Sequence, residues 1–111
     1  MTENQNTMAE FERARGQLAG ISAQKRNMQA QISMLDATNE ELGKTKEKNV
    51  YKAVGNILVP AETKTVIKDV KKQKETIDLR IKTVQKQEDA LMEKLNKLKT
   101  EIEGKDKNEK A

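Results

Sequence analysis

The sequence has neither cysteine nor histidine. Without them the chain has no disulfide, no thiol nucleophile, no imidazole base and no nitrogen or sulfur ligand for zinc. It also lacks a glycine-rich phosphate-binding loop. The adjacent carboxylates Glu40–Glu41 and Glu88–Asp89 would point in different directions on a helix, so we expect solvated surfaces there. The sequence therefore predicts a protein that is not an enzyme and has no catalytic residues, no cofactor and no metal.

Large apolar side chains are also scarce. Leu, Ile, Val and Phe together make up 22 of the 111 residues, and the chain has one Phe, one Tyr and no Trp. This is a small supply for a compact globular core. The modest net charge of +4 and the regular spacing of the apolar residues nevertheless argue against a disordered chain. Periodic apolar residues in a charged background indicate long helices.

Long hydrophobic runs are missing as well. No eighteen apolar residues run together, and the stretch MTENQNTMAEFERARG lacks the basic and apolar segments of a signal peptide. We therefore expect a soluble, cytoplasmic protein with no membrane partner. The densest lysine cluster, at 64–74, has almost no arginine or aromatic residue near it for stacking on bases. A solvated helix surface explains this cluster better than a nucleic-acid site.

Two series of apolar residues recur at alternating intervals of three and four. The first runs from Phe11 to Leu42, with eight of ten positions apolar, and the second from Ile67 to Ile102, with nine of eleven. This spacing is the seam of a coiled coil. We predict helices over about 8–43 and 64–103, each roughly 50 Å long. Because their lengths match, they can fold back as an antiparallel two-helix coiled coil.

Lys25 and Glu88 are charged exceptions on the two opposite seams. Counting outward from the centre of the chain places them within about one helical turn of each other. They either pair and fix the register of the two helices, or both extend to water.

The segment VYKAVGNILVP, at 50–60, separates the two helical series. Its β-branched residues around Gly55–Asn56 predict a β-hairpin with strands at about 50–54 and 57–60. A glycine at the first turn position favours a type II′ turn. Gly43 is a plausible stop for the first helix, Pro60 closes the second strand, and Thr63 or Thr65 can cap the second helix.

A single two-stranded hairpin is only marginally stable in water, and both of its edges carry unpaired backbone groups. The run 57–59 also places apolar side chains on both faces of the second strand. We therefore expect hairpins from several subunits to join in one sheet or barrel. The alternative is a plain helix–loop–helix bundle with an apolar loop. The candidate oligomerisation residues are Val50, Tyr51, Val54, Gly55, Ile57, Leu58 and Val59.

Several features weaken the free ends of the helices. Gly16 and Gly20 each cost the first helix up to about 1 kcal/mol relative to alanine, so the end should fray and expose its apolar side chains. After Ile102 the segment GKDKNEKA is charged and has no large apolar residue, which predicts a disordered tail over about 104–111.

The sequence resembles the β-type subunits of the prefoldin family, in particular its archaeal members. The resemblance is carried by VYKAVGNILV at 50–59, ISAQKRNMQAQI at 21–32 and KTVQKQEDALMEKL at 82–95, and it covers nearly all of the chain. The α-type subunits have two central hairpins, and this chain has room for one. Pro60 departs from the charged residue expected at that position.

The resemblance implies one prefoldin-like domain over 1–111 in an ATP-independent holdase. It implies a hexamer of two α-type and four β-type chains around a β-barrel platform, which passes unfolded proteins to a cytosolic group II chaperonin. It assigns client contact to six residues at the tips: Met8, Phe11, Leu18, Leu95, Leu98 and Ile102. These residues could equally close the coiled coil, and Tyr51 could be an ordinary packed aromatic at a subunit junction. The alternative functions are a structural coiled-coil adaptor and a basic nucleic-acid binder.

Overall fold

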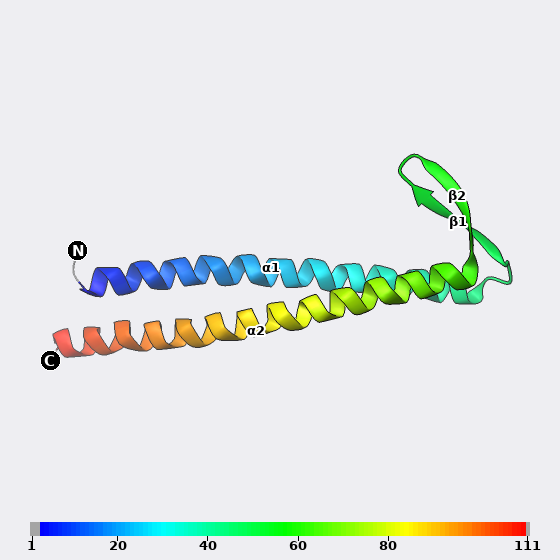
Figure 1. Ribbon diagram of the computed structural model, residues 1–111. Coiled ribbons are helices and arrows are strands. Elements are labelled where there is room, and N and C mark those ends of the chain that lie inside the picture. The colour runs from blue at the N-terminus through cyan, green and yellow to red at the C-terminus, as the bar shows by residue number, and fades with distance from the viewer. Residues whose placement is uncertain (1–2, 111) are drawn as a thin grey trace. The chain divides into compact units, whose positions relative to one another are not determined.

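The computed structural model describes residues 3–110, and the side chains of 5–104. The element order is α1 (Glu3–Lys44), β1 (Asn49–Val54), β2 (Ile57–Glu62) and α2 (Thr63–Lys110) (Figure 1). The predicted fold class, two long helices with a central antiparallel hairpin, is confirmed. The chain forms two compact units. The first consists of residues 3–27 together with 82–110, and the second is Met28–Ile81. Both helices run through both units.

The heptad spacing determines how α1 and α2 contact each other within each unit. Every residue of the two predicted apolar series is buried or half-buried, and the residues between them are mostly exposed. In the first unit the buried apolar residues are Ala14, Val84 and Leu98, and in the second they are Met28 and Val70. The 3.5-residue period therefore places one narrow stripe of each helix against the other.

The helix ends differ from those expected. Helix α1 already begins at Glu3, and it continues past Gly43 to Lys44. Helix α2 begins at Thr63 and continues to Lys110, where we expected a disordered tail; Ala111 lies outside the described residues. The reason is local, because the segment after Ile102 has no proline and is rich in lysine and glutamate, which are good helix formers.

The hairpin has the turn that the sequence predicted. Val54 is opposite Ile57 in the register, so a two-residue loop of Gly55 and Asn56 connects the strands. Gly55 has a φ of 60°, and no non-glycine residue among those described has a positive φ. A positive φ at the first loop position only is the signature of a type II′ turn. This turn matches the right-handed twist of the strands and fixes their register.

The second strand is longer than predicted. It continues through Pro60, which is opposite Tyr51, and ends at Glu62, opposite Asn49. Next to this last pair, the amide of Thr63 donates a 2.8 Å hydrogen bond to the carbonyl of Lys48. The Thr63 hydroxyl donates another, also 2.8 Å long, to the carbonyl of Glu47. Thr63 thus starts α2 and joins it to the segment before β1.

Candidate functional site

The six predicted tip residues all belong to the first unit, near the beginning of α1 and towards the end of α2, but their exposure differs. Met8 is 53% exposed, whereas Leu98 is only 7% exposed. The other four, Phe11, Leu18, Leu95 and Ile102, are half-buried. Leu98 can therefore contact another molecule only if the helices separate, whereas Met8 is accessible as the structure stands.

Three of the six residues lie together around a shallow surface hollow. Met8 and Phe11 from α1 and Ile102 from α2 line a hollow of about 240 Å³, together with Glu12, Lys99 and Glu103. A hollow lined by apolar side chains with charged ones among them suits weak contact with hydrophobic side chains, and the charges keep the surface hydrated.

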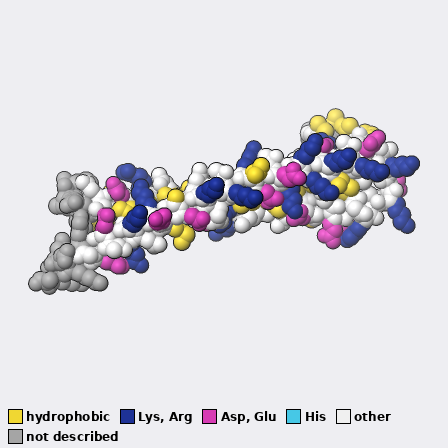
Figure 2. Space-filling view, turned by 60° about the horizontal axis from the view of Figure 1, so that its bottom comes forward, with side chains coloured by type: hydrophobic (Ala, Val, Ile, Leu, Met, Phe, Trp, Pro, Cys, Tyr) yellow, Lys and Arg dark blue, Asp and Glu magenta, His cyan; other side chains and the backbone are white. Residues whose placement is uncertain are grey.

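The hairpin is the second candidate site, and it exposes apolar side chains on both faces. Because side chains opposite each other share a face, Tyr51 lies with Pro60, and Ala53 with Leu58, on one face. Tyr51 is 74% exposed and Leu58 is 68% exposed. The other face carries Val54 and Ile57, which are exposed too. In Figure 2, hydrophobic side chains gather over the hairpin, with Lys and Arg around them.

The base of the hairpin lies beside the end of α1. Val50 is half-buried and, with Ala37, Thr38, Glu41, Leu42 and Thr45, lines a hollow of about 470 Å³. Of the predicted oligomerisation residues, Val50 is thus the one that is half-buried beside α1. The other predicted oligomerisation residues, including Gly55 at the turn, are exposed to solvent.

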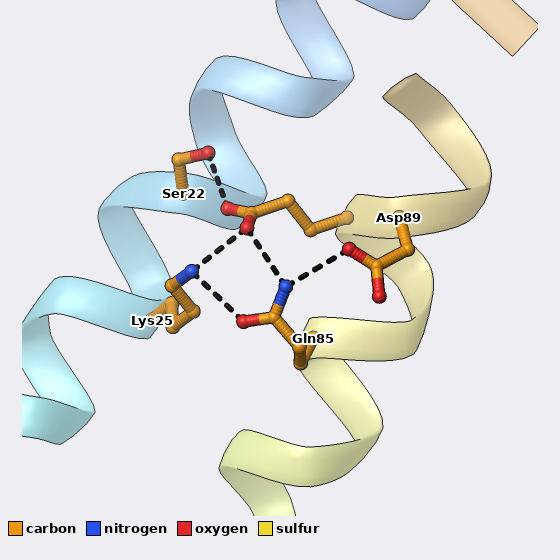
Figure 3. A network of polar contacts seen from close by, with 5 residues as sticks. Ser22, Lys25, Gln85 and Asp89 are labelled. Carbon is orange, nitrogen blue, oxygen red and sulfur yellow. Dashed lines mark hydrogen bonds and ion pairs between the residues drawn. The ribbon is translucent and has the colours of Figure 1, made fainter. Parts of the chain in front are cut away.

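Of the two alternatives for Lys25 and Glu88, the structure shows the pair, and the expectation of a solvated surface is wrong for Glu88, which is buried. The ammonium Nζ lies 2.7 Å from Oε1 of Glu88, and both side chains are largely buried. Ser22 donates a 2.7 Å hydrogen bond to Oε2 of the same carboxylate, and Gln85 donates one of 3.2 Å to Oε1. Gln85 also accepts from Lys25 and donates to Asp89, so the contacts form one network between α1 and α2 (Figure 3).

The network favours the ionised form of Glu88. The hydrogen bonds from Lys25 and then Ser22 lower the pKa of Glu88 below its ordinary value, and they outweigh the burial that would raise it. The sequence missed Ser22 and Gln85 because neither belongs to the apolar series. Each follows a seam residue, Ile21 or Val84, and so borders the contact between the helices. A search for polar residues directly after seam positions would have found both.

A second ion pair joins α1 and α2 in the second unit. Lys74, the other charged exception on the α2 seam, lies with Nζ 2.7 Å from Oδ1 of Asp36. The hydrogen bond and the negative charge of Asp36 raise the pKa of Lys74. Both charged residues that interrupt the α2 series therefore have an acidic or basic partner on α1.

Over the residues that the structure describes, no three His, Cys, Asp or Glu side chains gather where they could hold a metal ion. In the same range, neither helix contains a stretch that is long and apolar enough to cross a bilayer.

Comparison with known proteins gives a consistent result. A sequence model of the family described as prefoldin subunit matches residues 5–109. Prefoldin subunit beta of Archaeoglobus fulgidus is 40% identical over 91 residues, which cover 81% of this chain and 78% of that protein. Prefoldin subunit beta of Pyrobaculum arsenaticum is 32% identical over 99 residues, which cover 88% and 80%.

A solved structure agrees as well. The crystal structure of the prefoldin beta subunit from Thermococcus strain KS-1 matches with a TM-score of 0.87 and 25% sequence identity, over 94% of this chain and 92% of that one. The resemblance predicted from the central segment and the two flanking stretches is thereby confirmed.

Proposed function

Because this chain belongs to the prefoldin subunit family, we propose that it is one subunit of a chaperone that captures unfolded polypeptides without ATP. It assembles through its hairpin with α-type prefoldin subunits and with further copies of itself, as a hexamer of two α-type and four β-type chains. The complex acts in the cytoplasm and passes its clients to a group II chaperonin. The subunit is not an enzyme.

The observation that carries the capture role is the open hollow lined by Met8, Phe11 and Ile102. Unfolded chains expose apolar side chains without fixed geometry, so a capture surface must accept many shapes. The flexible thioether of Met8 adapts to different partners, and a shallow hollow makes only weak contacts with each.

Weak contacts become useful when several act together. If each subunit of a hexamer presents such a hollow, a client bound by one is held close to the others. The overall affinity can then exceed that of one hollow by about 10²–10⁴. Assembly and capture are thus two requirements of the same function, and they belong to different parts of the chain.

The test measures aggregation of a chemically denatured model protein after dilution into the hexamer, without ATP. We expect the wild-type hexamer to suppress light scattering. The triple variant Met8→Ser, Phe11→Ser, Ile102→Ser should lose most of this protection, because its hollow no longer offers apolar surface. Far-UV circular dichroism and molar mass verify that this variant folds and assembles.

The matched control is Met34→Ser. Met34 is 71% exposed and apolar, but it belongs to the second unit and does not line the hollow. We expect this variant to protect as well as wild type. If the triple variant protects equally well, the tip assignment is wrong. If both variants lose protection alike, any exposed apolar residue serves and the hollow has no special role.

A further inference from the structure

The exposed methionines are the side chains of this protein that an oxidant attacks most readily. The sequence has five methionines and no cysteine, whose thiol would otherwise react first. Among the described side chains, Met8, Met34 and Met92 are exposed, whereas Met28 is buried in the seam of α1. The thioether sulfur is soft and polarisable, so exposure decides which of these methionines reacts with a peroxide.

Met8 differs from the other two exposed methionines because it lines the hollow with Phe11 and Ile102. Phe11 and Ile102 are half-buried, so Met8 has the highest exposed fraction of the three apolar side chains there. Neither Met34 nor Met92 lines the hollow. A chemical change at Met8 therefore alters the hollow directly, whereas the same change at Met34 or Met92 leaves its lining as it is.

We propose that Met8 is a reversible oxidation site, and that conversion of its thioether to the sulfoxide by a hydroperoxide weakens client capture at the hollow. This inference rests on the proposed function, in which the hollow binds unfolded chains. In the forward step, hydrogen peroxide transfers one oxygen atom to the sulfur of Met8. The O–O bond breaks and an S–O bond forms, so the sulfur is oxidised and the peroxide is reduced to water.

The reverse step needs a thiol reductant. A thiol-dependent methionine sulfoxide reductase removes the oxygen atom from the sulfoxide, which leaves as water while two thiols become a disulfide. Because this chain has no cysteine, both thiols come from outside it. Oxidation gives two epimers of the sulfoxide, and each is reduced by its own class of reductase. Met8 is exposed, so neither direction requires α1 and α2 to separate.

The sulfoxide opposes the binding of apolar side chains. It replaces a flexible apolar group by a polar one. Its oxygen accepts hydrogen bonds from water or from the ammonium of Lys99, which also lines the hollow. A client then has to displace bound water before it contacts Phe11 and Ile102. When several hollows hold one client, the losses at the individual hollows multiply in the overall affinity.

Peroxide treatment of the assembled hexamer tests the inference. Catalase removes the hydrogen peroxide before a denatured model protein is added, and peptide mass spectrometry gives the oxidised fraction of each methionine. We expect the hexamer concentration that halves aggregation to rise at least roughly threefold as Met8 is oxidised. Treatment with both classes of methionine sulfoxide reductase should reverse this rise. Only peroxide doses that leave the buried Met28 reduced are compared, so that unfolding does not contribute.

Leucine variants identify the methionine that is responsible. Leucine is apolar and similar in size to methionine, but it cannot be oxidised. Each hexamer is compared with its own untreated sample, and the α-type partner is the same throughout, so oxidation of the partner is a constant background. We expect peroxide to leave the protection given by Met8→Leu unchanged. The double variant Met34→Leu, Met92→Leu should lose as much protection as wild type does.

A glutamine variant reproduces the change in polarity without an oxidant. Met8→Gln has a flexible polar side chain of similar length, so we expect it to protect as weakly as oxidised wild type. Peroxide should then weaken it no further.

The results separate this inference from the function beneath it. If wild type protects equally well once Met8 is oxidised, or if Met8→Leu loses as much protection as wild type, Met8 is not the oxidation site that controls capture. The same conclusion follows if the Met34 and Met92 double variant becomes insensitive to peroxide. The triple serine variant tests the proposed function independently of oxidation. If that variant and Met8→Gln both protect as well as untreated wild type, the hollow does not capture clients, and both proposals are wrong.

Discussion

The carboxylate of Glu88 accepts hydrogen bonds from Lys25, Ser22 and Gln85 at the line where α1 meets α2. A charge at this position is stable only while its partner is opposite it. If the helices slipped by one turn, Lys25 and Glu88 would each face apolar seam residues, at the cost of an unpaired charge. The pair therefore selects one alignment of the helices, even though apolar residues there could give similar or greater stability.

Removing one partner should cost more than removing both. We expect Lys25→Met to lower the melting temperature by on the order of 5 °C, because it leaves the Glu88 carboxylate without its cation. The double variant Lys25→Met, Glu88→Met should recover most of this loss, since it leaves no unpaired charge. Thermal unfolding followed by circular dichroism measures both. A double variant that is less stable than Lys25→Met would contradict this account.

The lowered pKa of Glu88 predicts a dependence on pH. A carboxyl group with a folded pKa below its unfolded pKa stabilises the fold above about pH 4.5, and this contribution is lost as the pH falls through the folded pKa. We expect wild type to be more stable than Glu88→Gln at pH 7, and the difference to shrink steadily below pH 4.5. Melting temperatures of both proteins across pH 3–7 provide the measurement. A difference that stays constant over this range would show that the charge of Glu88 does not matter.

At the scale of elements, the glycines of α1 and of the hairpin have opposite roles. Apart from the adjoining backbone of α1 itself, a Cβ added at Gly16 or Gly20 would meet no atom of the described structure within 4 Å, so packing against α2 does not require glycine there. A Cβ at Gly55 would also be in open space, but the φ of 60° is strained for other residues. Gly16 and Gly20 therefore lower the stability of α1 near its beginning, whereas Gly55 makes the hairpin turn possible.

Alanine substitutions should separate these roles. We expect Gly16→Ala and Gly20→Ala each to raise the free energy of unfolding by about 0.5–1 kcal/mol, the helix propensity difference. Gly55→Ala should instead destabilise the hairpin by about 1–3 kcal/mol. Denaturant unfolding measures all three. If Gly16→Ala and Gly20→Ala are destabilising, these glycines have a packing role that the structure does not contain.

The elements also show which features a sequence can predict. The seams of α1 and α2 depend on the local spacing of apolar residues, and the type II′ turn depends on one glycine, Gly55. The sequence pattern was therefore sufficient to predict both. The predicted helix ends were wrong because no proline interrupts the helices before Met8 or after Ile102, and α1 and α2 continue through the possible caps Thr7 and Gly104. The extension of β2 past Pro60 could not be predicted, since it depends on which strand pairs bond to each other. Ser22 and Gln85 were missed because they lie beside the seam.

For the whole molecule, we propose that capture and assembly belong to separate units. The first unit contains the hollow lined by Met8, Phe11 and Ile102, and the second contains the hairpin. Changes in one unit should therefore leave the activity of the other intact. The hairpin is the part that cannot be complete alone, because its outer edges have unpaired backbone groups and its apolar side chains are exposed on both faces.

The most direct test of this claim is the molar mass in solution, measured by light scattering during size-exclusion chromatography. The chain would be run alone at several concentrations and then mixed with an α-type prefoldin subunit. We predict that the mixture forms a species with a mass near that of six subunits. A folded 12.6 kDa monomer that persists at high concentration and beside the α-type subunit would contradict the account.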